Sequence, residues 1–281
     1  MRLRRGPDAI SPTGHYTGYV WVRHGLAPGA LATPEGRALY YAAEPAMRLS
    51  RAAGGPTFEG VLLARHQVLD TLLAQAVERG EIGQVVEVAA GLSARGHRFA
   101  ERFGPALTYV ETDLPGMAGR KRALLDRLGG TGPHHRVAEL DALRDTGPDS
   151  LAALADTLDP DTGTAILTEG LLNYFDRAAV TAMWRRFATV LARFPRGTYL
   201  ADLHLREQAG APAHRLGAGL VGAFVRGRVH FHFADRAEAE AELRAAGFAT
   251  ASVRGADDLA GRPGDRSARL AGIVAARTAR D

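Results

Sequence analysis

The stretch that decides the fold runs from Gln84 to Pro115 and reads QVVEVAAGLSARGHRFAERFGPALTYVETDLP. It opens with a valine-rich run, turns at small residues that end in Gly91, continues through a helical segment, and closes with a second apolar run carrying Glu111 and Asp113. This order predicts a strand, a tight turn, a helix and a strand, the first half of a nucleotide-binding α/β unit. Asp113 follows Gly91 by 22 residues, and an acid near that offset suits hydrogen bonding to ribose hydroxyls.

Each of these signals is weak when it is taken alone. The sequence AAGLSARG is not a G-x-G-x-x-G fingerprint, and Gly91 could simply end a strand. Asp113 could instead cap the helix that begins near Leu114 and Pro115. We favour the ligand interpretation because of the spacing from Gly91. We expect one of Glu111 and Asp113 to face a ligand at the carboxyl edge of the sheet while the other packs elsewhere.

A strand–helix alternation continues beyond this unit. We expect strands near 84–90, 107–113, 134–138, 163–168 and 197–203. The intervening helices are predicted near 95–103, 115–128, 148–157 and 176–193. This spacing predicts a parallel sheet with helices on both faces.

The segments on either side of this core have a different character. Helical spacing before the first strand predicts an all-helical region of about 80 residues, with helices near 15–26, 34–49 and 58–77. After the fifth strand a small-residue segment follows, then Val229 to Phe233 as a short strand or loop, a helix over 235–246, and strand-like runs near 248–254 and 269–276. We therefore expect one domain over 1–281, divided into a helical lid (1–80), a cofactor-binding core (81–204) and a lid insertion with closing strands (205–281).

Composition limits the class of protein. The 281 residues are 46% hydrophobic and 23% charged, as in ordinary globular proteins. We expect no membrane span and no secretion signal, because long apolar runs are missing. The chain has no cysteine, which excludes disulfides, thiolate metal ligands and cysteine nucleophiles. We take the cytoplasm as the expected location.

The net charge of +4 does not by itself indicate nucleic acid. The basic residues are scattered arginines, with Lys121 the only lysine, so a solvated surface or an anionic small molecule explains them better. The pairs His134-His135 and His230/His232 lack metal-ligand spacing. We expect no metal and no nucleic-acid partner.

A further carboxylate follows the predicted fourth strand, in TEGLLNYF (168–175). Glu169 stands where an apolar strand ends, and ligands bind at that edge in α/β proteins. Taken alone, a helix cap for Glu169 and a core position for Tyr174 are the favoured interpretations.

Five motifs together carry a resemblance to a known family. The five motifs are ARHQVLD (64–70), VVEVAAGLSAR (85–95), YVETDLP (109–115), AELDAL (138–143) and EGLLNYF (169–175). In this order and at this spacing, they resemble the leucine carboxyl methyltransferase family, particularly its bacterial polyketide O-methyltransferase branch. The N-terminal SPTGHYTGYVWVRHGL is similar to the start of that branch. The likeness covers roughly residues 10–205, and the ordered set is far more specific than any one motif.

The resemblance implies a class I methyltransferase that uses S-adenosylmethionine and releases S-adenosylhomocysteine. It implies a Rossmann-like, mostly parallel seven-stranded α/β sheet flanked by helices, with an N-terminal helical lid and an insertion after the fifth strand. The cofactor residues that it implies are Arg65 for the methionyl carboxylate, Ala89 and Gly91 in the turn, Asp113 for the ribose, Leu140 and Asp141 for the adenine, and Glu169 near the methionyl amino group. An ion pair of Arg65 with Asp70 or another neighbour is the purely structural alternative.

The chain departs from the family pattern at two places. A glycine usual in the family, two positions before Gly91, is Ala89 here, which leaves the turn less freedom. A lysine that some relatives carry near the N-terminus is absent. Arg23, His15 or Tyr16 could take its place, and the sequence does not choose among them.

The chemistry expected of such an enzyme depends on the acceptor. Methyl transfer from a sulfonium is an in-line displacement, so positioning is the main task. A carboxylate acceptor is already ionised and needs no base, whereas a phenol benefits from one. His204 is the first candidate base, followed by His24 and His15, and Tyr174 is a second candidate catalytic residue on the substrate side. We expect the substrate to be held by Tyr16, Tyr19, Trp21, Arg23, Tyr174 and Phe231.

We expect O-methylation of a carboxylate or hydroxyl on a small acceptor, such as a polyketide or another secondary metabolite. The alternatives are a non-catalytic regulatory protein that binds S-adenosylmethionine and a nicotinamide-dependent oxidoreductase on a similar sheet; the missing G-x-G-x-x-G argues against the latter. Methylation of a protein C-terminus is less favoured. The sequence leaves monomer and homodimer both open.

Overall fold

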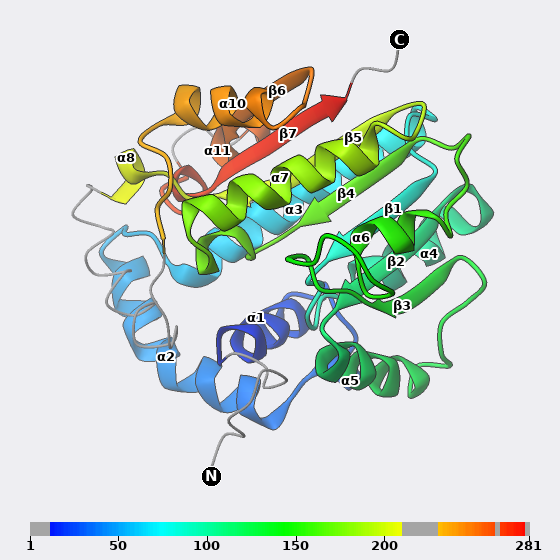
Figure 1. Cartoon of the computed structure of the whole chain (residues 1–281). Helices are drawn as coiled ribbons and strands as arrows, with labels where there is room; N and C mark the ends of the chain where they lie inside the picture. The colour runs from blue at the N-terminus through cyan, green and yellow to red at the C-terminus, as the bar shows by residue number, and fades with distance from the viewer. Residues whose placement is uncertain (1–11, 210–229, 262–264, 279–281) are drawn as a thin grey trace.

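A seven-stranded sheet forms the centre of the protein in the computed structural model, which describes residues 12–209, 230–261 and 265–278 (Figure 1). The strand order is β3-β2-β1-β4-β5-β7-β6. The strands are β1 (Gln84–Val88), β2 (Thr108–Asp113), β3 (His135–Glu139), β4 (Thr164–Thr168), β5 (Gly197–Leu203), β6 (Thr250–Gly255) and β7 (Gly272–Thr278). β1 to β5 are parallel, and β7 runs antiparallel between β5 and β6. The predicted mostly parallel α/β sheet is confirmed.

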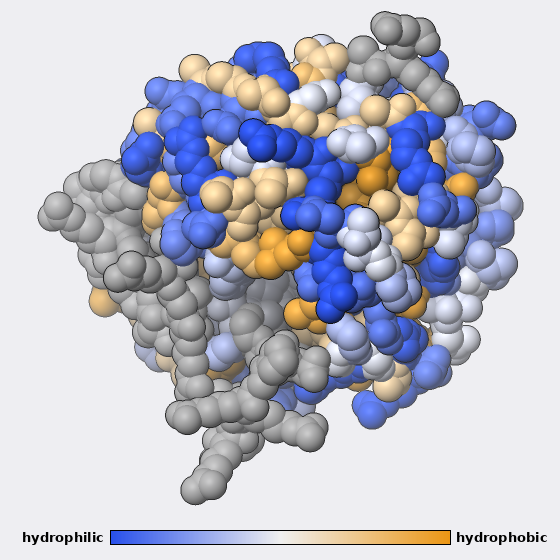
Figure 2. All heavy atoms as spheres, in the orientation of Figure 1, coloured by the Kyte–Doolittle hydropathy of each residue, from blue (hydrophilic) through white to orange (hydrophobic). Residues whose placement is uncertain are grey.

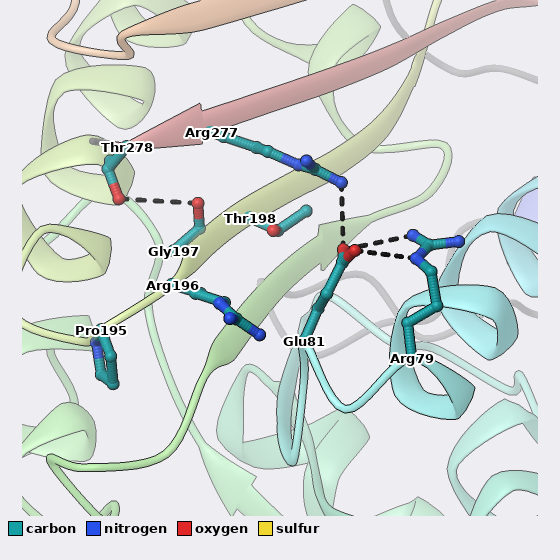
Figure 3. Close-up of a pocket in the computed structure, with 8 residues that line it drawn as sticks. All are labelled: Arg79, Glu81, Pro195, Arg196, Gly197, Thr198, Arg277 and Thr278. Atoms are coloured by element: carbon teal, nitrogen blue, oxygen red, sulfur yellow. Dashed lines mark hydrogen bonds and ion pairs between the residues drawn. The ribbon is translucent and has the colours of Figure 1, made fainter. Parts of the chain in front are cut away.

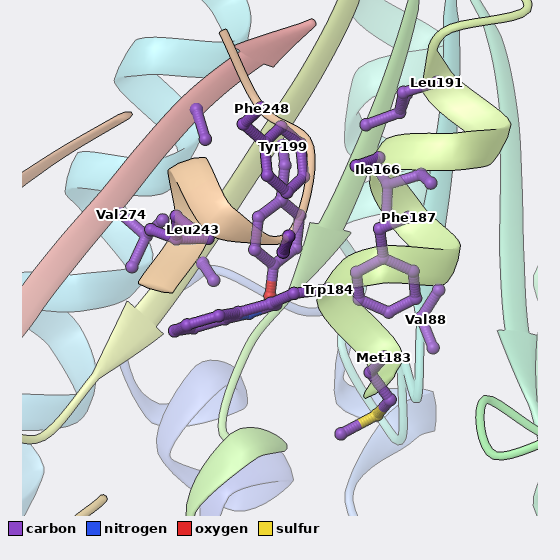
Figure 4. Close-up of a cluster of buried hydrophobic side chains, with 14 of the residues drawn as sticks. Val88, Ile166, Met183, Trp184, Phe187, Leu191, Tyr199, Leu243, Phe248 and Val274 are labelled. Carbon is purple, nitrogen blue, oxygen red and sulfur yellow. The ribbon is translucent and has the colours of Figure 1, made fainter. Parts of the chain in front are cut away.

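Helices cover both faces of the sheet because successive strand side chains point to opposite sides. Val85 packs with α3 (Phe58–Glu78) and α4 (Arg95–Phe103), whereas Val86 packs with α6 (Leu151–Ala155), α7 (Arg177–Leu191) and α10 (Arg236–Ala245). Figure 1 shows α3 and α7 on opposite sides of the strands. Figure 4 shows the α7 side of the core, where Trp184 and Phe187 of α7 pack near Tyr199 of β5.

A third apolar cluster joins the N-terminal helices α1 (Pro12–Arg23), α2 (Pro34–Ala52) and α3. Tyr16 of α1 stacks between Tyr40 and Phe58, with ring centroids 5.9 and 5.4 Å away. Thr33 caps α2 by accepting a hydrogen bond from the Gly36 N–H at 3.1 Å. The all-helical region predicted ahead of the first strand is therefore present.

Several predicted boundaries were wrong by a few residues. The first helix spans 12–23 rather than 15–26, because proline is tolerated in the first turn and Gly25 turns the chain with a φ of +69°. α6 begins only at Leu151, where Ser150 caps it by accepting from the Ala153 N–H at 3.2 Å. The last strand starts at 272 rather than 269, because Ala268–Leu270 form a 3₁₀ turn.

The remaining elements of the described residues are a fifth helix of 12 residues, two helices of four residues each, and four 3₁₀ turns. They are α5 (Pro115–Asp126), α8 (Arg206–Ala209), α11 (Ala256–Leu259) and the 3₁₀ turns η1 (Gly29–Leu31), η2 (Gly104–Ala106), η3 (Leu172–Tyr174) and η4 (Ala268–Leu270). Most of the predicted insertion after β5, residues 210–229, lies outside the described residues. The segment 230–233, predicted as a strand or loop, has no regular structure, and the His230 N–H donates to the Asn173 carbonyl at 2.9 Å.

The chain reverses its direction of travel across the sheet between β1 and β4. From β1 it moves outward through β2 to β3, and it returns to the other side of β1 for β4 and β5. Val88 pairs with Thr168, so the carboxyl ends of β1 and β4 lie side by side. Ligands of open α/β sheets bind at this kind of switch point, which directs attention to the residues that follow these two strands.

Candidate functional site

The turn after β1 is bonded to the end of β2. The Gly91 N–H donates to Oδ2 of Asp113 at 2.9 Å, and the Leu114 N–H donates to Oδ1 at 2.8 Å. Gly91 has a φ of +53°, and a Cβ built on it would meet no heavy atom within 4 Å. The turn therefore leaves open space beside its backbone, next to a carboxylate held by two N–H groups. Burial raises the pKa of Asp113, and these two N–H groups act against that rise.

Ala89 adopts a backbone conformation that normally belongs to glycine. Its φ is +57°, and it is the only non-glycine residue with a positive φ among residues 12–209, 230–261 and 265–278. The left-handed conformation costs an L-residue with a Cβ about 1 kcal/mol relative to glycine. The chain thus keeps the turn geometry at the position where we expected a glycine, at the expense of local strain.

The two acids of β2 have separate environments. Glu111 is fully buried and is paired with the Lys121 Nζ at 2.7 Å and the His135 Nε2 at 2.9 Å. Burial alone would raise the pKa of Glu111, but Lys121 and His135 outweigh it and lower that pKa. Glu111 thus lies within the protein interior, while Asp113, one pleat further along, stands at the sheet edge beside Gly91.

The end of β4 is bonded to α3 and β5 through Arg65. The Arg65 Nε donates to Oε1 of Glu169 at 3.1 Å, and its Nη1 donates to Oδ2 of Asp202 at 2.7 Å. Asp202 also accepts from the Gly170 N–H at 2.6 Å. A Cβ on Gly170, whose φ is +68°, would lie 2.8 Å from the Arg65 Nη2. Position 170 therefore needs glycine both for its backbone and for the space that Arg65 occupies.

A buried charge network lies behind Glu169. Its Oε2 contacts the His66 Nδ1 at 2.8 Å and the Arg95 Nη2 at 2.5 Å. Arg95, which has no exposed surface, also donates to Asp70 at 2.5 Å and to Glu87 at 2.6 Å. Burial acts to raise the pKa of Glu169, yet the surrounding His66 and arginines hold it well below its ordinary value. Glu169 is therefore an ionised carboxylate at the carboxyl end of β4.

The turn after β1, which contacts Asp113, and the residues after β4, which contact Arg65, lie close together because β1 and β4 are neighbouring strands. The pairing of Val88 with Thr168 sets the Gly91 turn and Glu169 at the same sheet edge. Two direct bonds, Gly91 to Asp113 and Arg65 to Glu169, complete the arrangement. Gly91, Asp113 and Glu169, which the sequence pointed to, and Arg65, which the family resemblance added, thus lie at one switch point.

The predicted adenine-side pair follows β3, the next strand. The Leu140 N–H donates to the Asp113 carbonyl at 2.9 Å, which sets Leu140 directly beside Asp113. Asp141 is half-buried, and its Oδ1 accepts from the Leu143 N–H at 3.0 Å. Both residues therefore lie along the same edge.

The predicted substrate residues of α1 divide between the site and the helical core. The Trp21 ring stacks on His66 with centroids 4.1 Å apart, and His66 contacts Glu169. Tyr16 and Tyr19 are buried among the N-terminal helices. Arg23 is exposed and lies 5.9 Å over the Tyr40 ring. Trp21 thus connects α1 to the charge network.

The remaining substrate-side candidates follow β4 and precede α10. Tyr174, in η3, is 41% exposed, and Phe231 is half-buried in the segment that is hydrogen bonded to Asn173. These two aromatic residues therefore sit on adjoining segments.

The candidate histidines occupy three different places. His204 follows β5, with its Nδ1 2.8 Å from the Leu270 carbonyl and its Nε2 3.9 Å from Oδ2 of Asp202. His24 contacts Glu59 at 2.7 Å, and His15 bonds to Thr33 at 2.9 Å, both within the N-terminal helices. Burial lowers the pKa of His204. Of the three candidate bases, His204 is the one that the fold places near Asp202, a partner of Arg65.

Several residues of this site were missed by sequence reasoning. They are His66, Asp70, Glu87, Arg95 and Asp202. A signal was present, because Glu87 interrupts a valine-rich strand and His66, Asp70 and Arg95 lie inside the quoted motifs. Asp70 was considered as a partner of Arg65, but it pairs with Arg95 and with Arg98, the latter at 2.6 Å.

A depression of about 630 Å³ lies at the opposite edge of the sheet, where β5 begins and β7 ends (Figure 3). It is lined by Arg79, Glu81, Arg196 and Arg277, with Glu81 paired to two of the arginines. This edge carries the amino end of β5 and is therefore separate from the switch-point site. Elsewhere, Figure 2 shows hydrophilic and hydrophobic residues intermixed over the face in view.

The described residues contain neither a candidate membrane span nor a candidate metal-ion site. Among their helices, none is at once long and apolar enough to cross a membrane. No group of three or more histidine, aspartate or glutamate side chains in the same residues is arranged to hold a metal ion.

The fold and site define a class I methyltransferase-like α/β protein, and comparisons with known proteins give the family. Residues 29–188 match the model of the leucine carboxyl methyltransferase family. This match covers more than half of the chain, so the protein belongs to the leucine carboxyl methyltransferase family.

Individual relatives agree with this family. A Streptomyces coelicolor protein, designated an S-adenosylmethionine-dependent methyltransferase, is 35% identical over 143 residues, which are 49% of this chain and 46% of the relative. The chain spans about half the length of the curated relatives it matches. Two solved structures share the fold: a DUF574 family protein from Streptomyces avermitilis (TM-score 0.63, 18% identity, 95% of this chain and 97% of that one) and a protein from Thermobifida fusca designated a methyltransferase (TM-score 0.62, 17% identity, 93% and 94%).

Proposed function

We propose that this protein is an S-adenosylmethionine-dependent methyltransferase that methylates an oxygen atom of a small acceptor. The observation that carries the proposal is the meeting of Gly91, Asp113, Arg65 and Glu169 at the switch point between β1 and β4. Family membership and the designation of the Streptomyces coelicolor relative support the same cofactor.

The residues at the switch point fit the chemical groups of that cofactor. Asp113 is held by two N–H groups, and each of its oxygens keeps a lone pair that can accept from a ribose hydroxyl. The open space beside Gly91 allows a ligand to approach the backbone. Arg65 offers a planar guanidinium for a carboxylate, and Glu169 offers an ionised carboxylate for an ammonium.

When bound, S-adenosylmethionine supplies an activated methyl group on a sulfonium. The work of this chain is to bind and orient, because the in-line displacement depends on alignment of acceptor, methyl carbon and sulfur. Trp21, Tyr174 and Phe231 are the aromatic residues that we expect to contact the acceptor. A carboxylate acceptor then needs only to lose water, whereas a hydroxyl acceptor must also lose a proton.

His204 is suited to accept that proton. Its Nδ1 lies 2.8 Å from the Leu270 carbonyl, so Nδ1 is the donor and Nε2 carries the lone pair in the neutral ring. Because burial lowers the pKa of His204, the neutral form is favoured at pH 7. We expect His204→Asn to lower kcat for a phenol about 100-fold and to change kcat for a carboxylate acceptor little.

The test combines binding with transfer of a labelled methyl group. Calorimetry with S-adenosylmethionine, S-adenosylhomocysteine, NAD and NADP is followed by mass spectrometry after incubation with aromatic and polyketide-like acids and phenols. We expect binding of the first two ligands only, and label on an oxygen of at least one acceptor.

A matched pair of variants ties the result to the site. Asp113→Asn should weaken S-adenosylhomocysteine binding about tenfold, because charge-assisted hydrogen bonds are lost. Asp161→Asn, at an exposed position before β4, should bind as the wild type does. Cofactor binding with no transfer to any acceptor favours a regulatory, non-catalytic protein, and NAD binding instead of S-adenosylmethionine refutes the proposal.

A further inference from the structure

We propose that Asp202 is a positioning residue, which fixes Arg65 and the Gly170 turn in the geometry that receives the amino-acid end of the cofactor. The inference rests on the proposed function, since the ligand it concerns is S-adenosylmethionine. It adds a residue that the sequence motifs did not single out.

Asp202, in β5, connects α3 to the turn that follows β4. It lies near the carboxyl end of β5 and is 2% exposed. Its Oδ2 accepts from the Arg65 Nη1 at 2.7 Å, and its Oδ1 accepts from the Gly170 N–H at 2.6 Å. One carboxylate therefore holds both the side chain from α3 and the backbone that follows Glu169.

The guanidinium group of Arg65 is held in place by contacts with three residues. Glu169 accepts from Nε at 3.1 Å, Asp202 accepts from Nη1, and the backbone of Gly170 leaves only enough room for Nη2. The side chain has several rotatable bonds, so an arginine without such partners would lose binding energy in becoming ordered. These bonds use two of the five guanidinium N–H groups. With the plane already fixed, binding a ligand carboxylate requires little further ordering.

An asparagine at position 202 cannot replace the carboxylate. Both contacts of Asp202 are with donors, the Arg65 Nη1 and the Gly170 N–H. In asparagine one of the two terminal atoms is itself a donor. Whichever way the amide is turned, a donor faces a donor and one contact is lost. The substitution keeps the size of the side chain while removing one of the two contacts by which Asp202 positions Arg65 and Gly170.

Two ligands separate this role from a general role in folding. S-adenosylhomocysteine carries the amino and carboxyl groups that Arg65 and Glu169 would bind, whereas 5′-methylthioadenosine has the same nucleoside without them. A residue that positions only the amino-acid subsite affects the first ligand and leaves the second unchanged. A residue that merely supports the fold affects both.

The experiment measures the dissociation constants of both ligands by calorimetry for the wild type, Asp202→Asn and Asp257→Asn. Asp257 is the matched control, because it is also buried and paired with an arginine, Arg269 at 3.2 Å, but belongs to α11. We expect Asp202→Asn to bind S-adenosylhomocysteine about tenfold or more weakly and 5′-methylthioadenosine within twofold of wild type. Asp257→Asn should bind both as the wild type does.

Equal weakening of both ligands, or no change in either, overturns the positioning role. If Asp202→Asn does not fold, Gly170→Ala displaces Arg65 from the opposite side, since its Cβ would lie 2.8 Å from Nη2, and the same contrast between the ligands is expected. A wild-type chain that binds neither ligand refutes the proposed function itself. Failure of the inference and failure of the proposed function therefore give different results.

Discussion

Replacement of Arg95 by methionine should destabilise the protein strongly. Arg95 is fully buried and donates to Asp70, Glu87 and Glu169 at 2.5 to 2.6 Å. Methionine keeps much of the volume but leaves these carboxylates without their shared cation. Removing one partner of a buried ion pair typically costs about 3–5 kcal/mol, because the remaining charge is buried and uncompensated. Glu87 is affected most, since the Tyr109 hydroxyl is the other group that donates to its carboxylate, at 2.7 Å.

Equilibrium unfolding in urea gives the free energy of unfolding for this test. A loss of about 3–5 kcal/mol corresponds to a fall in melting temperature of roughly 5–9 °C in a chain of this size. Arg79→Met is the control, because Arg79 forms an ion pair with Glu81 at 2.7 Å but is half exposed, so its loss should change the free energy of unfolding little. A loss below about 1 kcal/mol for Arg95→Met, similar to the control, refutes the argument that this network is held together by its central cation.

The pH dependence of the same variant adds a second check. Burial raises the pKa of Glu87, and Arg95 opposes that rise. Without Arg95 the folded-state pKa of Glu87 should rise further above its unfolded value. A group with a raised pKa contributes stability at low pH that is lost as pH increases. The deficit of Arg95→Met relative to wild type should therefore be larger at pH 8 than at pH 5.

Two further predictions concern the turn after β1 and the buried histidines. Ala89→Gly should increase the free energy of unfolding by about 0.5–1 kcal/mol, because it relieves a φ of +57°; Ala90→Gly, next to it, should decrease the stability, and a decrease for both would show that Ala89 is not strained. Burial lowers the pKa of His15 and of His232, so the unfolded chain binds protons first as pH falls through about 6.5. The free energy of unfolding should then decrease from pH 7.5 to 5.5, with a shallower slope in His232→Gln, and an unchanged slope in that variant contradicts the assignment.

The sheet was predictable because its signals are local. The valine-rich run of β1, the turn at Gly91 and the second strand follow one another within one stretch, and strand–helix alternation fixes a parallel sheet. The placement of Asp113 beside Gly91 follows from the same local order, since a βαβ unit returns the chain to a neighbouring strand. Boundaries were less accurate, because caps such as Ser150 depend on single hydrogen bonds.

The charge network was not predictable, because its partners are far apart in the sequence. Arg65 and Asp202 are 137 residues apart in the sequence, and Arg65 and Glu169 are 104 apart. No periodicity links such positions, so only the three-dimensional fold pairs them. Asp70 is an example. It lies on the same helix as Arg65, and we considered it as a partner of Arg65, but in the structure it pairs with Arg95. A buried acid such as Glu87 in an apolar strand indicates that a cation is needed, but not which one.

The two halves of the site should therefore respond differently to substitution. The half that we propose binds the ribose depends on backbone conformation at Ala89 and Gly91 and on two N–H groups that hold Asp113, so changes there should alter affinity while leaving most of the interior packing intact. The amino-acid half depends on carboxylates and guanidinium groups inside the protein, so changes at Arg95 alter stability as well. Trp21 extends this second half to α1, because its ring stacks on His66. In the proposed function, binding at the amino-acid end is therefore connected through Trp21 to the N-terminal helices, where we expect part of the acceptor site. The Gly91 turn also contacts these helices, because Leu92 belongs to the same apolar cluster as α1.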